Sequence, residues 1–411
     1  MKNKIYCILG EYKNSRVKII ILSKKSYDIK LDINKNSTKE RSMYINIQKY
    51  KANEIILENI KEGYKYNIFF INNDDTEVID KLEINLEKNP FNNVKIVNCD
   101  SNFGIETNTW SLINKNFGVV FHIGDFLYND SIFRKYFNHY IKTNNIEYEK
   151  MYKELYDNYI VCITRKLYYL KNNFNYVMTD DHETVDDAYY EKNKDNKIFM
   201  KIYKMFKEVE IKILQKLRFE IKPLEFVYDD TNKTIYILNH ENIIINNDII
   251  KKYNIYENIK NYKNIFFLER KCFTSSSPSL ISNLIFQEKE LIINNDNLYK
   301  ILEKLHNKNI YILSGDYHII SSMDIYNKSN NKICSVKNIG AINTCVDIFK
   351  TDIFLTSNVY TNEHKEIVNR NGFININYKN NKLIFTNLIN NKTNIIFNII
   401  NNIITGIKFV L

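Results

Sequence analysis

The sequence predicts an α/β protein whose larger, mixed part follows a small all-β domain. Two observations lead to this prediction. Residues 4–87 contain short strands separated by turn-prone residues and show no helical periodicity, whereas the chain beyond residue 93 alternates apolar strands with helical stretches. Pro90 lies between the two patterns. We therefore expect an N-terminal β-sandwich domain over residues 1–90 and a larger α/β domain over residues 91–411.

The N-terminal part has the pattern of short, partly buried strands. The segments "RVKIIILSK" (16–24), "SMYINIQKY" (42–50) and "YKYNIFFINN" (64–73) are rich in β-branched and aromatic residues, often in alternation with polar ones. Turn-prone residues such as Asn73 and Asp74 follow them. Short strands at this spacing, without helices between them, favour a β-sandwich of immunoglobulin or fibronectin type.

The part beyond residue 93 is predicted to mix strands with helices. Helical spacing of apolar residues appears at 131–170, 185–217 and 298–306. The stretch from 333 to 411 returns to strands separated by Asn-rich turns. Five apolar runs are the expected central strands: 94–100, 118–125, 175–181, 265–271 and 309–316.

Composition restricts the class of protein. The chain has 411 residues, of which 44% are hydrophobic, and no apolar run approaches the roughly 20 residues that a membrane helix needs. The apolar stretch near the N-terminus, Ile5 to Leu9, is shorter than the roughly 7–15 residues of a secretory signal. We therefore expect a soluble, intracellular protein. The six cysteines form no C-x-x-C pair, so we expect neither a disulfide framework nor a four-cysteine zinc site.

The net charge of +10 comes from 58 Lys and Arg residues against 48 Asp and Glu residues. The lysines are scattered and form no dense block of like charge, which is more typical of a solvated surface than of a nucleic-acid interface. Weak attraction for anionic substrates is expected. A nucleic-acid partner is the weaker alternative.

Polar and charged residues directly follow four of the expected strands. In an α/β sheet, ligands bind beyond the carboxyl ends of the strands. Carboxylates gathered there repel each other unless cations or protons neutralise them. Oxygen ligands together with a histidine, a tyrosine and a thiolate suit a centre of two or three cations that includes a redox-capable metal such as iron. The residues at these four ends are Cys99 and Asp100; Asp125 and Tyr128; Asp180, Asp181 and His182; and Asp316 and His318.

These segments resemble, in the same order, the motifs of the PhoD-like alkaline phosphatases and phosphodiesterases of the metallophosphatase superfamily. "IVNCDSN" is similar to the S-C box, with Asn98 in place of serine, and "IGDFLYND" is similar to the G-D-x-x-Y box. "MTDDHETVDD" resembles the D-D-H-E box and "ILSGDYHII" the S-G-D-x-H box. "FLERKCF" resembles the D-x-R segment, with Glu269 in place of the usual aspartate. The resemblance implies a metallophosphatase-type β-sandwich core with flanking helices, preceded by the small all-β domain.

The resemblance also implies roles for individual residues. His182 contacts the substrate or protonates the leaving group, and Arg270 holds a phosphate oxygen through its fork of donors. Cys99 and Tyr128 bind iron, and Asp125 bridges two metal ions. The implied cofactors are iron and calcium, with manganese, magnesium or zinc as alternatives at the outer sites. The implied metal ligands are Cys99, Asp125, Tyr128, Asp181, Asp316 and His318.

The sequence therefore predicts metal-dependent hydrolysis of phosphoric esters, either monoesters or diesters, by a metal-activated hydroxide. Two other functions stay open: a non-catalytic phosphate-binding or structural protein that retains the fold, and a phosphodiesterase that acts on nucleic acid. Two local alternatives also stay open. Asp125 has the residue type of a helix N-cap. The segment "ILNHENI" resembles the superfamily's G-N-H-E box but has Leu238 in place of glycine, and we interpret it as a turn.

Overall fold

The computed structural model divides into two compact units. The first contains residues 1–96, 113–222 and 375–385, and the second contains residues 97–112, 223–374 and 386–411. The structure describes residues 5–73, 77–98, 100, 110, 116–185, 195–241, 243, 247–270, 302, 304–305, 307–315, 320–326, 331–339, 361–368, 372–379 and 382–389.

Every regular element among the described residues between 6 and 85 is a strand, as the sequence predicts. Neighbouring strands in both N-terminal sheets are antiparallel. Strand β6 buries every second residue, which matches its alternating sequence. The three-stranded sheet has the order β1 (Tyr6–Lys13), β2 (Arg16–Leu22) and β5 (Asn53–Leu57). The four-stranded sheet has the order β4 (Thr38–Ile47), β3 (Tyr27–Lys35), β6 (Lys65–Asn72) and β7 (Val78–Asn85).

These strands belong to the same compact unit as residues 113–222. Strand β1 contacts both helix α2 (Tyr148–Lys171) and strand β10 (Asn173–Met178). The approach near η3 (Gln215–Leu217) is so close that a Cβ atom added to Gly10 of β1 would meet the carbonyl oxygen of Leu217 at 2.3 Å. A separate immunoglobulin-like domain over residues 1–90 stays a prediction.

A five-stranded sheet carries two of the predicted functional strands. Strands β9 and β10 are parallel neighbours, paired from Gly118 and Asn173 to Ile123 and Met178, and every residue of both is buried. This register brings the loops after β9 and β10 to the same edge of the sheet. Ahead of β8, the 3-10 helix η1 spans Pro90–Asn92. The order of the sheet is β10, β9 (Gly118–Ile123), β8 (Asn93–Val97), β18 (Gly372–Lys379) and β19 (Lys382–Ile389).

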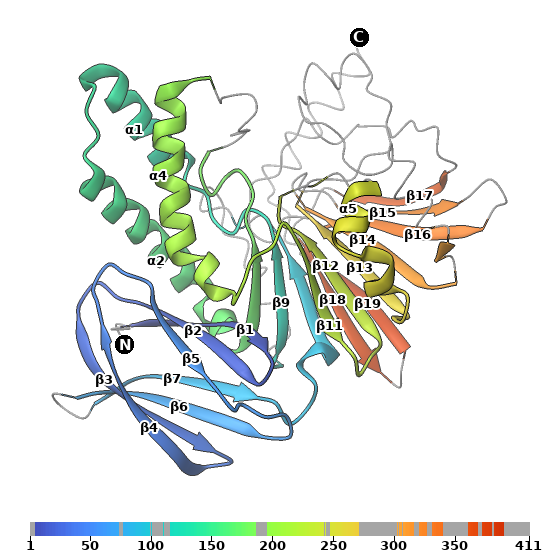
Figure 1. The fold of residues 1–411 in the computed structure, drawn as a ribbon, viewed down its shortest axis with the longest axis horizontal. Coiled ribbons are helices and arrows are strands. Elements are labelled where there is room, and N and C mark those ends of the chain that lie inside the picture. The colour runs from blue at the N-terminus through green and yellow to red at the C-terminus, as the bar shows by residue number, and fades with distance from the viewer. Residues whose placement is uncertain are drawn as a thin grey trace. The chain divides into compact units, whose positions relative to one another are not determined.

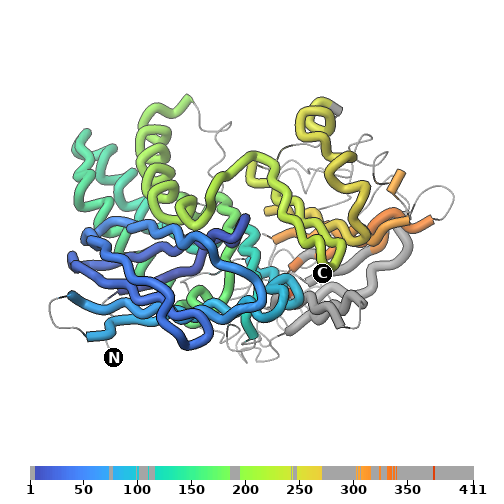
Figure 2. Tube along the Cα trace, turned by 60° about the horizontal axis from the view of Figure 1, so that its bottom comes forward, coloured from blue at the N-terminus to red at the C-terminus, as the bar shows by residue number. Residues whose placement is uncertain are grey.

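Three helices of the first unit pack against one another: α1 (Asp130–Thr143), α2 and α4 (Lys197–Ile213). Figures 1 and 2 show them beside the N-terminal strands, with α2 against β1. The helices expected within residues 131–170 and 185–217 are thus confirmed, although the second begins at Lys197. Asn196 sets this start, because its side-chain oxygen accepts a hydrogen bond from the N–H of Phe199 at 3.0 Å.

The second unit contains a seven-stranded sheet, in which β12, β13, β14 and β16 are parallel. Its order is β11 (Leu224–Asp229), β12 (Thr234–Asn239), β13 (Asn264–Glu269), β14 (Asn309–Ser314), β16 (Lys332–Asn338), β15 (Ile320–Tyr326) and β17 (Thr361–Val368). Apolar residues of β12, β13 and β14 form a core with the short helices α5 (Asn247–Lys252) and α6 (Ile255–Ile259). The structure is therefore a mixed α/β protein, as predicted. Among the described residues, no helix has the length and apolar character to cross a membrane.

Candidate metal centre

The loop after β9 has an unusual backbone. Gly124 and Asp125 both have positive φ angles, 105° and 46°, in a region that side chains other than glycine rarely adopt. The N–H of Gly124 donates to the carbonyl oxygen of Met178 at 3.0 Å, which ties this loop to the end of the neighbouring strand. Helix α1 begins at Asp130, with Asn129 as its N-cap residue. Asp125 therefore does not cap α1, and the N-cap interpretation is wrong.

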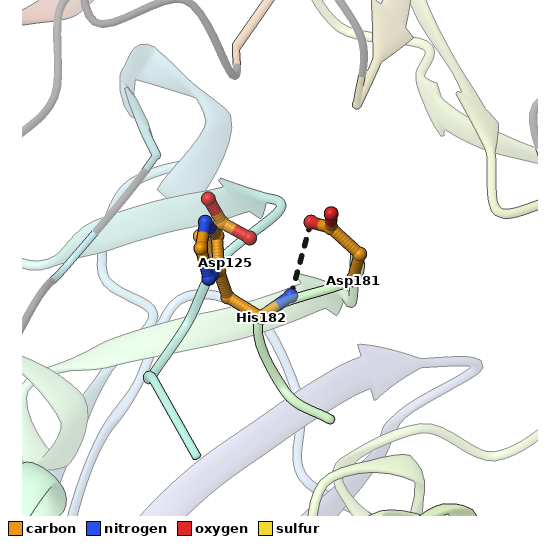
Figure 3. Close-up of side chains that lie close together, drawn as sticks. All are labelled: Asp125, Asp181 and His182. Atoms are coloured by element: carbon orange, nitrogen blue, oxygen red, sulfur yellow. Dashed lines mark hydrogen bonds between the residues drawn. The ribbon is translucent and has the colours of Figure 1, made fainter. Parts of the chain in front are cut away.

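Three side chains from the loops after β9 and β10 come together (Figure 3). Asp125, Asp181 and His182 each offer a ligand atom, and these atoms all lie within 4.8 Å of one another. Asp125 is buried, whereas Asp181 and His182 are partly exposed. Carboxylate oxygens and imidazole nitrogens bind a metal ion at about 2.0–2.6 Å, so ligands of one ion lie within roughly 5 Å of each other. The cluster thus has the composition and the spacing of a site for a single cation.

Two neighbouring side chains orient this cluster. The hydroxyl of Tyr128 donates to Oδ2 of Asp125 at 3.1 Å, and its ring lies against the His182 ring with centroids 4.0 Å apart. The carboxylate of Asp130 lies 3.0 Å from Nδ1 of His182. Asp130 occupies Nδ1, which leaves Nε2 as the ring nitrogen for a ligand. The sequence interpretation included Tyr128 but not Asp130, although both belong to the quoted segment "IGDFLYND".

The electrostatics of the cluster favour a bound positive charge. Burial raises the pKa of Asp125 well above its usual range; His182 opposes this shift, while Asp181 adds to it. Burial by itself lowers the pKa of His182, but Asp125, Asp130 and Asp181 outweigh it and raise the pKa to about 11. In the metal-free protein a protonated His182 therefore balances part of the negative charge. A metal ion would do the same more completely.

Glu183 joins the two loops that carry the cluster. Its carboxylate accepts a hydrogen bond from the N–H of Phe126 through Oε1 and from the N–H of Asp180 through Oε2, the latter at 2.7 Å. Burial, with Glu210 nearby, raises its pKa to about 7, although Lys207 opposes the shift. The sequence interpretation assigned no role to Glu183. The only signal for it was its place within "DDHE".

The structure brings together four of the predicted site residues and leaves the others untested. Asp125, Tyr128, Asp181 and His182 form the cluster described above. Arg270 directly follows β13 in the second unit, and its role as a phosphate ligand stays a prediction. The predicted ligands that lie outside the described residues are Cys99, Asp316 and His318.

A buried acid at the end of β13 is a further candidate, which the sequence interpretation placed in the D-x-R segment but gave no role. Glu269 is 2% exposed, and among the described residues neither of its carboxylate oxygens has a partner at hydrogen-bonding geometry. Burial raises its pKa to about 8; Asn239, its neighbour in register on β12, and Arg270 only weaken this effect. An unpaired buried carboxylate requires a proton or a cation. Its position at a strand end, directly before Arg270, was the available signal.

The segment "ILNHENI" is a turn after β12, as interpreted from the sequence. His240 and Glu241 lie in the turn, while Asn239 is the last residue of the strand. The side chain of Asn239 closes the turn by bonding to both the N–H and the carbonyl oxygen of Ile243, at 2.8 and 3.0 Å. Nε2 of His240 lies 3.1 Å from the carboxylate of Glu225. The histidine therefore has a structural partner within this sheet.

Comparison with known proteins shows the fold. No protein-family model matches the sequence, and no curated protein matches it. A solved structure of PhoD is similar over 90% of this chain and 83% of its own, with a TM-score of 0.62 and 10% identity. A purple acid phosphatase from yellow lupin (Lupinus luteus) seeds is similar over 95% of this chain and 73% of its own, with a TM-score of 0.59 and 10% identity. The chain therefore shares its fold with PhoD and with this purple acid phosphatase, as the resemblance of its motifs predicts.

Proposed function

We propose that this protein hydrolyses phosphoric esters with metal ions held at Asp125 and Asp181. One observation carries the proposal. The ligand atoms of two carboxylates and an imidazole lie within 4.8 Å of one another at adjacent strand ends. The similarity in fold to PhoD and to a purple acid phosphatase supports phosphate esters as the substrate class. Their 10% identity leaves the choice between monoesters and diesters to experiment.

Each residue of the cluster has a separate role in the proposed reaction. A bound metal ion supplies positive charge that polarises a phosphoryl oxygen and lowers the pKa of a water molecule. Asp125 and Asp181 hold that ion. His182 does not bind the ion in this proposal: it donates a proton to the leaving oxygen through Nε2, while Asp130 holds the ring at Nδ1. Tyr128 holds Oδ2 of Asp125 and packs against the His182 ring, which limits the movement of both.

The wider ligand set extends this proposal. Cys99, Asp316 and His318 complete the metal centre, and Arg270 holds a phosphate oxygen. In the metal-loaded protein Tyr128 would give up its hydrogen bond to Asp125 and bind iron as a phenolate, and calcium would occupy an outer site, with manganese, magnesium or zinc as alternatives. The order of the motifs along the sequence supports these assignments. An iron–phenolate pair absorbs visible light, so a coloured protein that loses its colour in a Tyr128→Phe variant is the expected observation.

Chelator-sensitive hydrolysis tests the proposal directly. Purified protein should hydrolyse bis(4-nitrophenyl) phosphate or 4-nitrophenyl phosphate, and a chelator should remove the activity. Asp181→Ala should lower kcat/KM by at least about 100-fold, which corresponds to about 2.7 kcal/mol of transition-state stabilisation. Asp28→Ala, at an exposed position of β3, is the control and should leave the activity unchanged. Folded protein that shows no activity with any added metal would favour the non-catalytic phosphate-binding protein.

Asp130→Asn should slow the reaction most for esters with poor leaving groups. Without the carboxylate at Nδ1, the pKa of His182 falls and its ring loses a partner that fixes its orientation. Fewer protein molecules then hold a proton directed at the leaving oxygen, and we expect a loss of about 10- to 100-fold for an alkyl phosphate ester. A 4-nitrophenyl ester, whose leaving oxygen needs no proton, should lose little. The measurement is kcat for both esters with the wild-type and variant proteins. An equal loss for both esters would contradict proton donation by His182.

A nucleic-acid substrate has no support from the two similar structures. The function motivated by the net charge of +10 therefore stays a prediction. Binding to a polynucleotide that weakens steeply between low and physiological salt would support it. Absence of such binding would remove it.

A further inference from the structure

Two buried side chains, Glu183 and Lys166, bind the backbone of Phe126, the residue that follows Asp125. Glu183 accepts a hydrogen bond from the N–H of Phe126. Lys166 of helix α2 donates from Nζ to the carbonyl oxygen of Phe126 at 2.6 Å, and the same Nζ lies 3.6 Å from the centroid of the Phe126 ring. Glu183 and Lys166 are both 0% exposed. Side chains from two separate elements thus bind both polar backbone groups of one residue.

These hydrogen bonds lie next to a residue with a strained backbone conformation. Asp125 has a φ of 46°, and a residue held in such a sparsely populated region costs about 1–3 kcal/mol. A conformation of this kind persists only where the surrounding structure determines it. On the amino side of Asp125, Gly124 bonds to Met178 of β10 at 3.0 Å. On its carboxyl side, the bonds to Phe126 supply the support.

The same carboxylate also sets the position of the second loop. Oε1 of Glu183 binds the N–H next to Asp125, and Oε2 binds the N–H of Asp180 at 2.7 Å, next to Asp181. The two oxygens of one carboxylate are held at a fixed separation by covalent geometry, so they restrict the separation of the two loops. That separation decides whether Asp125 and Asp181 can bind the same ion.

Packing alone does not require a lysine at position 166. Burial of an ammonium group costs several kcal/mol, and an apolar side chain of similar length would fill the space without that cost. The cost is offset here by the hydrogen bond to the carbonyl oxygen of Phe126 and by the contact with its ring. The charge therefore does something that an apolar side chain cannot do: it holds the Phe126 carbonyl in place.

We propose that Lys166 and Glu183 are positioning residues of the metal centre. They hold the backbone around Asp125 and the loop of Asp181 so that both carboxylates reach one cation. Neither residue is among the three side chains that offer a ligand atom to the cluster. This inference rests on the proposed metal-dependent function, and its test uses metal binding rather than hydrolysis.

The test measures the affinity of the metal-free protein for Mn²⁺ by calorimetry, together with the thermal unfolding midpoint. The variants are Lys166→Met, Glu183→Gln and the control Lys95→Met. Lys95 is also 0% exposed and also donates to a backbone carbonyl, that of Asn116 at 2.8 Å. Lys95 differs from Lys166 in its location. Its Nζ also donates to the side chain of Asn173, the first residue of β10, whereas the metal cluster follows Met178, the last residue of that strand.

Removal of an outer partner of a metal ligand typically weakens metal binding by about 10- to 100-fold, and we expect this for Lys166→Met and Glu183→Gln. Lys95→Met should lower the unfolding midpoint without changing the Mn²⁺ affinity. If Lys166→Met does not fold, Lys166→Gln, with a shorter neutral donor, allows the same comparison and should bind Mn²⁺ more weakly than the wild type.

Wild-type Mn²⁺ affinity in the Lys166 variant would overturn the inference. Equal weakening in Lys95→Met would also overturn it, because the effect would then follow from a general loss of stability. A wild-type protein that binds no Mn²⁺ would instead reject the metal centre itself, and the inference with it. The failure of the inference and the failure of the proposed function therefore give different results.

Discussion

Asp125→Asn should abolish metal-dependent hydrolysis and, at the same time, stabilise the metal-free protein at neutral and alkaline pH. We expect kcat/KM to fall by at least about 100-fold, because asparagine is a poor replacement for an ionised metal ligand. The gain in stability has a separate cause. Burial raises the pKa of this carboxyl well above its usual range, so the folded protein resists its ionisation. Asparagine keeps the shape and removes the charge.

The sign of the pH dependence follows from proton linkage. A carboxyl with a raised pKa in the folded state binds more protons folded than unfolded, so the stability of the wild type falls as pH rises above the usual pKa. The Asp125→Asn variant has no carboxyl at this position, so its stability should not show this decrease with pH. The measurement is the unfolding midpoint of both metal-free proteins between pH 5 and about pH 9.

Asp229→Asn is a suitable control for this variant. Asp229 is 3% exposed, and its carboxylate accepts a hydrogen bond from the side chain of Asn232 at 2.7 Å, in the turn between β11 and β12. Its replacement should lower stability and leave Mn²⁺ binding unchanged, because the partner loses an acceptor. If Asp125→Asn destabilised the metal-free protein across the whole pH range, a net cost of burying the Asp125 charge would be excluded.

Glu269→Gln should make the metal-free protein more stable at pH 8, with no gain below about pH 4.5. The pKa of Glu269 rises from 4.5 to about 8 on folding, mainly through burial. Between these two values the folded protein holds a proton that the unfolded chain releases, so wild-type stability falls by up to about 1.4 kcal/mol per pH unit. In the Glu269→Gln variant this contribution to the decrease in stability is absent. Denaturant unfolding of the two proteins at pH 4.5, 6 and 8 measures the difference.

Glu225→Gln is the matched control for Glu269→Gln. Both glutamates are buried in the same sheet, but Glu225 has a partner, the imidazole of His240 at 3.1 Å. Breaking that pair should give no gain in stability at pH 8. A Glu269→Gln variant with the same pH dependence as the wild type would show that the carboxyl of Glu269 ionises without cost, contrary to its environment.

Much of the fold could be predicted because the strands are simple in sequence. Strands β9 and β10 are mostly apolar, with His122, Asn173 and Asn175 as exceptions, and their existence could be predicted. Their ends were placed less well, because the expected runs 118–125 and 175–181 continue past Ile123 and Met178, where the strands end. The start of α4 could not be placed correctly. The helical spacing extends back to residue 185, but the cap at Asn196 decides where the helix begins.

The residues that support the metal cluster were harder to find than the cluster itself. Asp125, Asp181 and His182 stand out because charge directly after an apolar strand is unusual and has a chemical meaning. Lys166 lies on a helix that also carries the exposed Lys150 and Lys153, and the sequence interpretation assigned it no role. Its burial depends on contact with Phe126, 40 residues earlier in the chain.

The sequence by itself determined that strands precede a mixed α/β part and that acidic side chains gather after β9 and β10, because periodicity and order along the chain carry this information. The tertiary structure alone decided which charges have partners: Glu183 and Lys166 hold the backbone of Phe126, and Asp130 holds His182, whereas Glu269 is buried without a hydrogen-bond partner among the described residues. The physical reason is that desolvation and hydrogen bonding depend on distances in space. Those distances are fixed by contacts between residues that lie far apart in the sequence.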